Sequence, residues 1–176
     1  MAAPSVNPGA ILAPIRGRAW LVGDDVDTDV LAPGAYMRGP VEELARHCLE
    51  AVRPDFAAGV AEGDIVVAGR NFGMGSSREQ AAQALRILGV GAVLAPSFGG
   101  IFYRNAFNLG LPVLVCDHGG RIADGDRLVV EPMAGRVADE TAGIALDSDA
   151  VPDHLAAIVA SGGLIPYLKQ RFARQS

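Results

Sequence analysis

Cysteine and lysine are nearly absent from this sequence of 176 residues. The only cysteines, Cys48 and Cys116, are too few for a disulfide scaffold or a tetrahedral zinc site, and such usage is typical of a reducing compartment. An iron–sulfur cluster normally takes about four thiolates, so we expect this chain to bind no cofactor by itself. A Schiff-base enzyme would depend on Lys169 alone.

Positive charge and long apolar runs are also scarce. Fifteen basic and twenty acidic residues give a net charge of −5, which disfavours nucleic acids and anionic membranes as partners. No apolar run reaches the roughly 18 residues of a membrane-spanning helix, and the apolar residues 1–14 lack the positive charge that begins a signal peptide. We therefore predict a cytoplasmic protein with a flexible N-terminal extension at residues 1–17 and one domain at 18–176.

The order of apolar segments predicts an α/β fold. Half of the residues are hydrophobic, but only 6% are aromatic, so the core is expected to consist mainly of Ala, Val, Leu and Ile. The middle of the chain alternates strand and helix patterns, which predicts a parallel sheet with covering helices, and glycine-linked short strands then add an antiparallel part. The expected strands are at 18–22, 64–68, 91–95, 112–115, 126–130, 136–139 and 143–146, and the expected helices at 41–52, 78–88, 101–109, 152–160 and 164–173.

The strongest local signal is a glycine- and hydroxyl-rich run at residues 69–80, GRNFGMGSSREQ, between an expected strand and an expected helix. Ligands bind at the carboxyl ends of parallel strands, and the first N–H groups of a helix attract anions. Ser76, Ser77 and Arg78 could therefore hold a carboxylate or a phosphate. An ordinary capping box that begins at Ser76 or Ser77 fits the same letters, and spacing alone does not separate the two interpretations.

Other motifs fail at specific residues. The run lacks the Gly-Lys-Ser/Thr ending of a phosphate-binding loop and the Gly-x-Ser-x-Gly of a hydrolase elbow, and Arg78 stands where a dinucleotide fingerprint needs glycine. The aspartates of residues 24–29 begin like a calcium loop, but Val30 and Tyr36 occupy the positions that need glycine and glutamate. We interpret these aspartates as solvated turn carboxylates. The three histidines show no metal-ligand spacing.

Three motifs in order resemble a known family. They are DTD at residues 27–29, NFGMGSSRE at 71–79 and APSFGGIFYRN at 95–105. Together they make residues 18–131 similar to the small subunit of the 3-isopropylmalate dehydratase group, within the aconitase family. The resemblance implies the swivelling β/β/α domain of that family, a hydro-lyase half that is inactive alone, and a role in leucine and branched-chain amino acid biosynthesis.

The resemblance also implies partners. Family members dehydrate and rehydrate a hydroxy di- or tricarboxylic acid, and their [4Fe–4S] cluster lies on a separate large subunit or domain, where its open iron acts as a Lewis acid. We therefore expect a heterodimer with a cluster-bearing large subunit and a small carboxylic acid as substrate. A homodimer is an option for the isolated chain.

The resemblance assigns roles to individual residues. The family's catalytic serine falls on Ser76, an alkoxide-like base that takes the proton alpha to a carboxylate. Its anion needs stabilisation, which helix N–H groups and Arg78 could supply. Ser77 and Arg78 match residues that bind the substrate carboxylate. Arg38 falls in the substrate-selecting loop, where an arginine favours a distal carboxylate.

Two departures and two open choices remain. Met74 and Gln80 stand where many members have cysteine and histidine. The arginine-bearing loop keeps homoaconitate, citrate-like acids, citraconate and dimethylmalate open beside 3-isopropylmalate. The alternative function is a non-catalytic carboxylate-binding or scaffold module of the same fold. A neighbouring gene for a cluster-binding large subunit would favour the enzyme.

Overall fold

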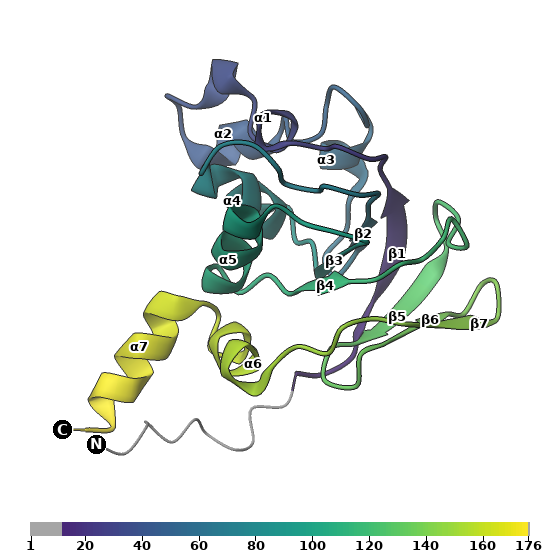
Figure 1. The fold of residues 1–176 in the computed structure, drawn as a ribbon. Coiled ribbons are helices and arrows are strands. Elements are labelled where there is room, and N and C mark those ends of the chain that lie inside the picture. The colour runs from purple at the N-terminus through teal and green to yellow at the C-terminus, as the bar shows by residue number, and fades with distance from the viewer. Residues whose placement is uncertain (1–11, 176) are drawn as a thin grey trace.

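The structure is a computed structural model that describes residues 12–175, so most of the expected N-terminal extension lies outside the described residues. A seven-stranded sheet in the order β4-β3-β2-β1-β5-β6-β7 forms its centre (Figure 1). The strands are β1 (Ile15–Leu21), β2 (Ile65–Val67), β3 (Ala92–Ala95), β4 (Val113–Val115), β5 (Arg127–Glu131), β6 (Arg136–Asp139) and β7 (Ile144–Asp147). The helices are α1 (Thr28–Leu31), α2 (Val41–Ala45), α3 (Phe56–Gly59), α4 (Glu79–Ile87), α5 (Gly100–Asn108), α6 (Asp153–Ala160) and α7 (Leu164–Ala173).

Strand β1 joins a parallel and an antiparallel half. It pairs in parallel with β2, and the parallel pairing continues through β3 to β4. On its other edge β1 pairs antiparallel with β5, which is followed by β6 and β7. The mixed sheet with covering helices is therefore confirmed, and β1 adds a fourth strand to the parallel part.

The start of β1 differs from the expectation. The strand begins at Ile15, which pairs with Val130, so residues 15–17 belong to the sheet and not to an extension. Gly17 allows this because a Cβ there would lie 2.2 Å from the carbonyl oxygen of Gly63. The pattern Arg-Gly-Arg at 16–18 conceals the strand, since neither type of residue signals a buried β-strand.

The expected helix at 41–52 is wrong in its second half. Helix α2 ends at Ala45, and at Leu49 the backbone takes a φ of 65°, which an α-helix cannot contain. The Leu49 N–H instead donates to the carbonyl of Val30 at 3.1 Å. The turns after α2 thus bury Cys48 and Leu49 completely, which reproduces an apolar spacing that resembles a longer helix.

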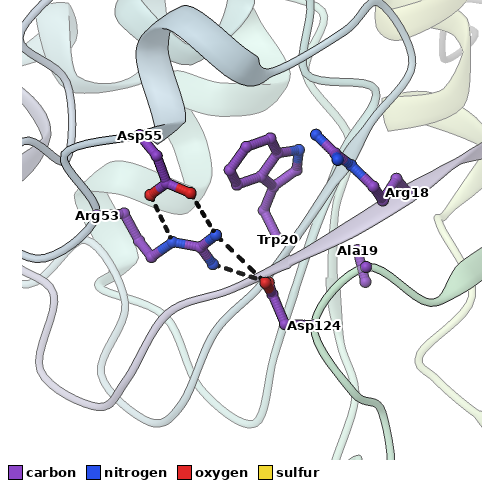
Figure 2. Close-up of a pocket in the computed structure, with 7 residues that line it drawn as sticks. Arg18, Ala19, Trp20, Arg53, Asp55 and Asp124 are labelled. Atoms are coloured by element: carbon purple, nitrogen blue, oxygen red, sulfur yellow. Dashed lines mark hydrogen bonds and ion pairs between the residues drawn. The ribbon is translucent and has the colours of Figure 1, made fainter.

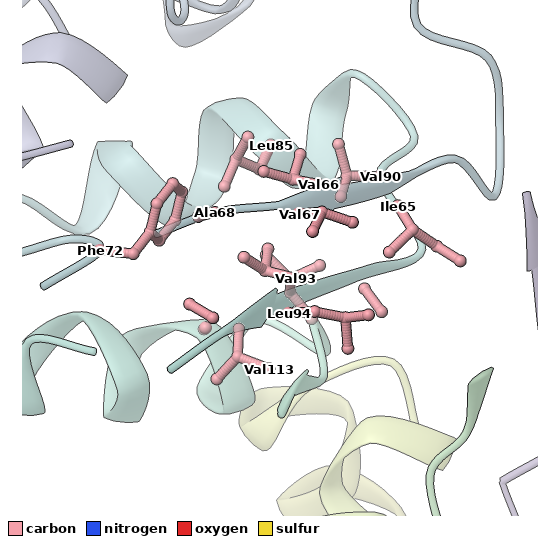
Figure 3. Packing of buried hydrophobic residues seen from close by; sticks show 14 of the residues in the cluster. Ile65, Val66, Val67, Ala68, Phe72, Leu85, Val90, Val93, Leu94 and Val113 are labelled. Atoms are coloured by element: carbon pink, nitrogen blue, oxygen red, sulfur yellow. The ribbon is translucent and has the colours of Figure 1, made fainter. Parts of the chain in front are cut away.

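The core lies between the parallel strands and α4. Every residue of β2 and β3 is buried, and Figure 3 shows Leu85 of α4 beside Val66 of β2. Helix α4 also buries Ala81, Ala82 and Ala84. The loop that joins β2 to α4 therefore runs from a fully buried strand to a helix with a buried face. No helix within residues 12–175 is long and apolar enough to cross a membrane.

Candidate active site

Three loops meet at the carboxyl ends of β1, β2 and β3. The Gly73 N–H donates to the carbonyl of Val26 at 2.7 Å, which joins the loop after β2 to the loop after β1. The Phe72 N–H donates to the carbonyl of Ser97 at 3.1 Å, and the Phe72 carbonyl accepts from the Gly99 N–H at 2.8 Å. These two bonds join the loop after β2 to the loop after β3. These loops therefore meet at the carboxyl ends of the parallel strands, where a ligand site is expected.

Asn71 connects the three loops through hydrogen bonds. Its backbone is left-handed, with a φ of 61°, a conformation that asparagine tolerates better than most residues. Its side-chain Nδ2 donates to Asp25 Oδ1 at 2.8 Å, and its backbone N–H donates to Ser97 Oγ at 2.8 Å. One residue thus bonds to the loops on either side of its own.

Two glycines of the run make room for protein atoms. A Cβ at Gly69 would lie 2.0 Å from Asp24 Oδ1, and one at Gly73, where φ is +76°, would lie 2.3 Å from the Phe102 ring. The sequence suggests glycines that admit a ligand to the backbone. At these two positions the space is already filled by Asp24 and Phe102.

The aspartates between β1 and α1 all have protein partners, which corrects their interpretation as merely solvated carboxylates. Asp24 Oδ1 accepts from the Arg70 N–H at 2.7 Å, and Asp25 accepts from Asn71. Asp27 Oδ1 caps α1 by accepting from the Val30 N–H at 3.0 Å, and Asp29 forms an ion pair with Arg78. These carboxylates fix the loop geometry.

Ser76 is an exposed serine bonded to a buried threonine. The Ser76 Oγ lies 3.0 Å from Thr28 Oγ1, and the Ser76 N–H donates to the same oxygen at 3.1 Å. Helix α4 begins at Glu79, with Arg78 as its N-cap and no side-chain capping bond, so the capping-box interpretation is wrong. The sequence gives Thr28 no role of its own, although it is the centre of the DTD motif.

Arg78 reaches back to α1. Its Nη1 donates to the carbonyl of Ala32 at 3.0 Å and forms the ion pair with Asp29. Its side chain is 27% exposed, so the guanidinium remains accessible from solvent. A carboxylate that binds there shares Arg78 with Asp29.

Ser77 lies between Ser76 and Arg78 in the sequence, whereas no contact of Arg38 with these residues is seen within residues 12–175. Both are exposed, and within residues 12–175 neither forms a side-chain hydrogen bond or an ion pair. The loop of Arg38 starts beside Arg78, because a Cβ at Gly34 would lie 4.0 Å from Arg78 Nη2. In this loop the Tyr36 ring stacks on His47 at 3.6 Å.

A second polar cluster lies at a surface pocket of about 100 Å³ beside β1. Figure 2 shows the Trp20 ring between the guanidinium groups of Arg18 and Arg53, at 4.4 and 4.8 Å from the ring centre. Arg53 also bonds to Asp55 and Asp124, at 3.1 and 2.8 Å. The hydrogen bonds that Arg53 donates lower the pKa of the Asp124 carboxyl. These charges balance one another, so the cluster fastens the end of β1 and offers no free group for catalysis.

The residues present do not fit an iron–sulfur cluster. Cys48 follows α2 and Cys116 follows β4, and both are buried. Burial raises the pKa of Cys48 above its usual range and that of Cys116 to about 11, which keeps both thiols protonated and poor as metal ligands. Among the described residues no group of three or more His, Cys, Asp or Glu side chains could hold a metal ion.

Comparison with known proteins identifies the family. Residues 52–118 match the Aconitase C-terminal domain. The chain is 49% identical over 157 residues to the 3-isopropylmalate dehydratase small subunit of Methanosarcina mazei, which covers 89% of this chain and 97% of that protein. The chain belongs to the 3-isopropylmalate dehydratase small-subunit family.

The chain is also similar to a homoaconitase small subunit and to a solved structure. The methanogen homoaconitase small subunit of Methanothermobacter thermautotrophicus is 48% identical over 157 residues, with 88% of this chain and 91% of that protein covered. A crystal structure of 3-isopropylmalate dehydratase from Methanocaldococcus jannaschii has a TM-score of 0.88 and 41% identity, and covers 93% of this chain and 98% of that one. The resemblance read from the three motifs, and the fold it implied, are confirmed.

Proposed function

We propose that this chain is the small subunit of a hydro-lyase that isomerises or dehydrates a 2-hydroxy di- or tricarboxylic acid. The names of its relatives support this, including the dehydratase and homoaconitase small subunits. The observation that carries the proposal is the exposed Ser76, fixed by Thr28 and two residues before Arg78, at the carboxyl ends of the parallel strands. The alternative of a non-catalytic carboxylate-binding or scaffold module is not favoured, because the named relatives are enzyme subunits.

In this proposal the chain supplies the base and part of the carboxylate grip. Ser76 Oγ takes the proton from the carbon alpha to a carboxylate and returns it in the reverse direction. Arg78 binds that carboxylate, and the exposed hydroxyl of Ser77 adds a hydrogen bond. Arg78 can do this from its present position because one of its nitrogens is already fixed by Asp29 and Ala32.

The exposed position of Ser76 points to a partner. A neutral serine hydroxyl is far too weak a base unless its anion is stabilised, and a site from which water is excluded strengthens the interactions that stabilise it. We propose that a large subunit covers these loops and holds the [4Fe–4S] cluster, for which this chain has no ligands among its described residues. The active form is then a heterodimer, and two free cysteines favour a cytoplasmic location.

Arg38 is proposed as the residue that selects the substrate. Overall identity does not decide the matter, since dehydratase and homoaconitase small subunits are 49% and 48% identical to this chain. Arg38 is exposed and has no hydrogen-bond or ion-pair partner in the described part of the chain, so its guanidinium can bind the distal carboxylate of homoaconitate or a similar acid. With 3-isopropylmalate as substrate, the enzyme would serve leucine biosynthesis.

The test is to purify the chain alone and together with the large subunit of the same organism. We expect dehydratase activity on at least one acid of a panel, 3-isopropylmalate, homoaconitate, citraconate and dimethylmalate, from the complex only. Full activity from the chain alone would contradict the proposal. A complex that forms, carries iron and converts none of the acids would also contradict it.

A further inference from the structure

The buried Thr28 contacts Ser76, the proposed base, through its side-chain hydroxyl. Thr28 is the first residue of α1 and is 2% exposed. Its Oγ1 is 3.1 Å from the Ser76 nitrogen and 3.0 Å from the Ser76 Oγ. One hydroxyl oxygen therefore touches both the backbone and the side chain of the same serine.

The number of available protons fixes the direction of the hydrogen bond between the Thr28 and Ser76 hydroxyls once Ser76 is an anion. A threonine hydroxyl has one proton to donate and two lone pairs to accept with. The Ser76 N–H must donate, so this contact uses a lone pair of Thr28 Oγ1. While Ser76 is neutral, either hydroxyl can donate to the other. Once Ser76 has lost its proton, only Thr28 can donate.

Within residues 12–175, no other acceptor competes for the Thr28 proton. A threonine inside a helix often bonds to the carbonyl four residues earlier, but Thr28 opens its helix and has no such carbonyl. Among the described residues, Ser76 is the only hydrogen-bond partner of its side chain. Burial makes the bond stronger, because a hydrogen bond gains electrostatic energy in a low dielectric.

Hydrogen bonds hold the backbone at Thr28 in place. Its own N–H donates to the carbonyl of Met74 at 2.9 Å, and Asp27 caps the helix that it begins. The next residue, Asp29, forms the ion pair with Arg78. A single turn of helix thus fixes both Ser76 and Arg78.

We propose that Thr28 is a positioning residue that donates a hydrogen bond to the Ser76 oxyanion and so makes Ser76 a usable base. The inference deepens the proposed function and rests on Ser76 being the base. In the proton step the Ser76 O–H bond forms as the substrate C–H bond breaks, and the electron pair of that bond enters the new double bond as hydroxide leaves. The Thr28 proton stays on Thr28. A bond to a charged oxygen is about twice as strong as one to a neutral hydroxyl, so the gain appears only where Ser76 is anionic.

The test uses the complex with its large subunit and the variant Thr28→Val, which keeps the shape and removes the hydroxyl. We expect kcat to fall by about 10- to 100-fold with little change in KM, because the buried Thr28 does not reach the substrate. The loss should shrink as pH rises, since higher pH favours the Ser76 anion without help. Thr28→Ser, which retains the hydroxyl, should restore most of kcat.

Control variants separate a positioning role from a structural one. Thr141→Val removes a hydroxyl that also accepts one backbone N–H, from Arg127 at 2.9 Å in the antiparallel half, and should leave kinetics unchanged. Should the valine variant not assemble, the smaller Thr28→Ala provides the same comparison. Wild-type kcat without the hydroxyl, or a loss that neither pH nor Thr28→Ser relieves, would overturn the role of Thr28.

Ser76→Ala distinguishes this failure from that of the proposed function. If its complex keeps turnover, Ser76 is not the base, and both inferences fall. If Ser76→Ala loses turnover while the hydroxyl-free Thr28 variants behave as wild type, the proposed function stands and only the role of Thr28 is wrong.

Discussion

In the parallel half of the sheet, β1 to β4, aspartates that follow the carboxyl end of β1 are exposed, whereas in the antiparallel half, β5 to β7, two aspartates are buried beside the strands. Asp24, Asp25 and Asp29 are exposed and accept hydrogen bonds or ion pairs from a neighbouring loop. Asp126 and Asp139 are 8% and 1% exposed. The same residue type thus fixes backbone N–H groups from an exposed position in one half and from a buried position in the other.

The difference follows from how the strands are connected. Parallel strands need helical crossovers, so their loops diverge at one edge and leave polar groups such as Ser76 accessible. Antiparallel strands close through tight turns, as at Gly143, where φ is +70°. We therefore expect substitutions at the edge of the parallel half to change activity, and substitutions in the antiparallel half to change stability.

The largest effect is expected from Ser76→Ala in the complex with the large subunit. Loss of a positioned base should lower kcat by about 10²–10⁴-fold, with only a small fall in melting temperature, because the Thr28 hydroxyl loses its hydrogen bond to Ser76. Ser77→Ala, its neighbour without a hydrogen-bonded partner among the described residues, should lose far less. Equal effects of the two changes would break the assignment.

Arg78→Lys should follow, with a fall in kcat/KM of about 10²–10³-fold. A lysine ammonium offers one point charge where a planar fork has to bind Asp29, the Ala32 carbonyl and a substrate carboxylate together. Steady-state kinetics check this, with Arg86→Lys in the same helix as the control. Wild-type kcat/KM in Arg78→Lys would show that the fork geometry is not used.

Arg38→Val should change which substrate is preferred. We expect activity on acids with a distal carboxylate to fall by about 10²-fold, since an unpaired carboxylate would remain in the site, while an isopropyl-bearing acid loses little or gains. The measurement is the ratio of kcat/KM for homoaconitate and 3-isopropylmalate. A ratio as unresponsive as that of the remote Arg136→Val would move the choice of substrate elsewhere.

The smallest effect concerns the antiparallel half. Burial and the neighbouring carboxyl of Asp126 raise the pKa of Asp139 above its usual range, and Asp139 Oδ2 lacks a hydrogen-bond donor among the described residues. Because the folded pKa is raised, Asp139 stabilises the fold at low pH, and this contribution is lost as pH rises through that pKa. The amide of Asp139→Asn can donate to Asp126 at any pH.

Asp139→Asn should therefore melt about 2–4 °C higher than wild type at pH 8, the shift expected for roughly 1 kcal/mol in a domain of this size. The advantage should shrink toward pH 4, and kcat of the complex should not change. Melting curves across pH test this, with the exposed Asp147→Asn on β7 as the control. A variant less stable at pH 8 would contradict the buried acid pair.

Sequence periodicity predicts the strands and the helices of two or more turns, and it fails at the single-turn helices. The strands β2 to β4 and the helices α4 and α5 lie within a few residues of their expected positions, because buried apolar runs and helical stripes specify them. Helices α1 and α3 span a single turn each and carry no readable period. The left-handed turn at Leu49 is likewise set by tertiary packing.

The site was predictable in its place and only partly in its contacts. The edge of the sheet and the serine–arginine run follow from a strand, a glycine-rich loop and a helix in sequence. That the Ser76 hydroxyl bonds to Thr28 and not to its own helix depends on a contact between positions 48 residues apart. Local spacing cannot reveal such a contact, which is why the capping box was a reasonable but wrong expectation.

The central claim is that Ser76 carries the proton to and from the substrate carbon. It is tested most directly by hydrating the unsaturated acid in D₂O with the complex and following deuterium at the alpha carbon by NMR. The account predicts that wild type incorporates deuterium with each turnover, and that Ser76→Ala binds the acid but incorporates almost none. Incorporation by Ser76→Ala at the wild-type rate would contradict it.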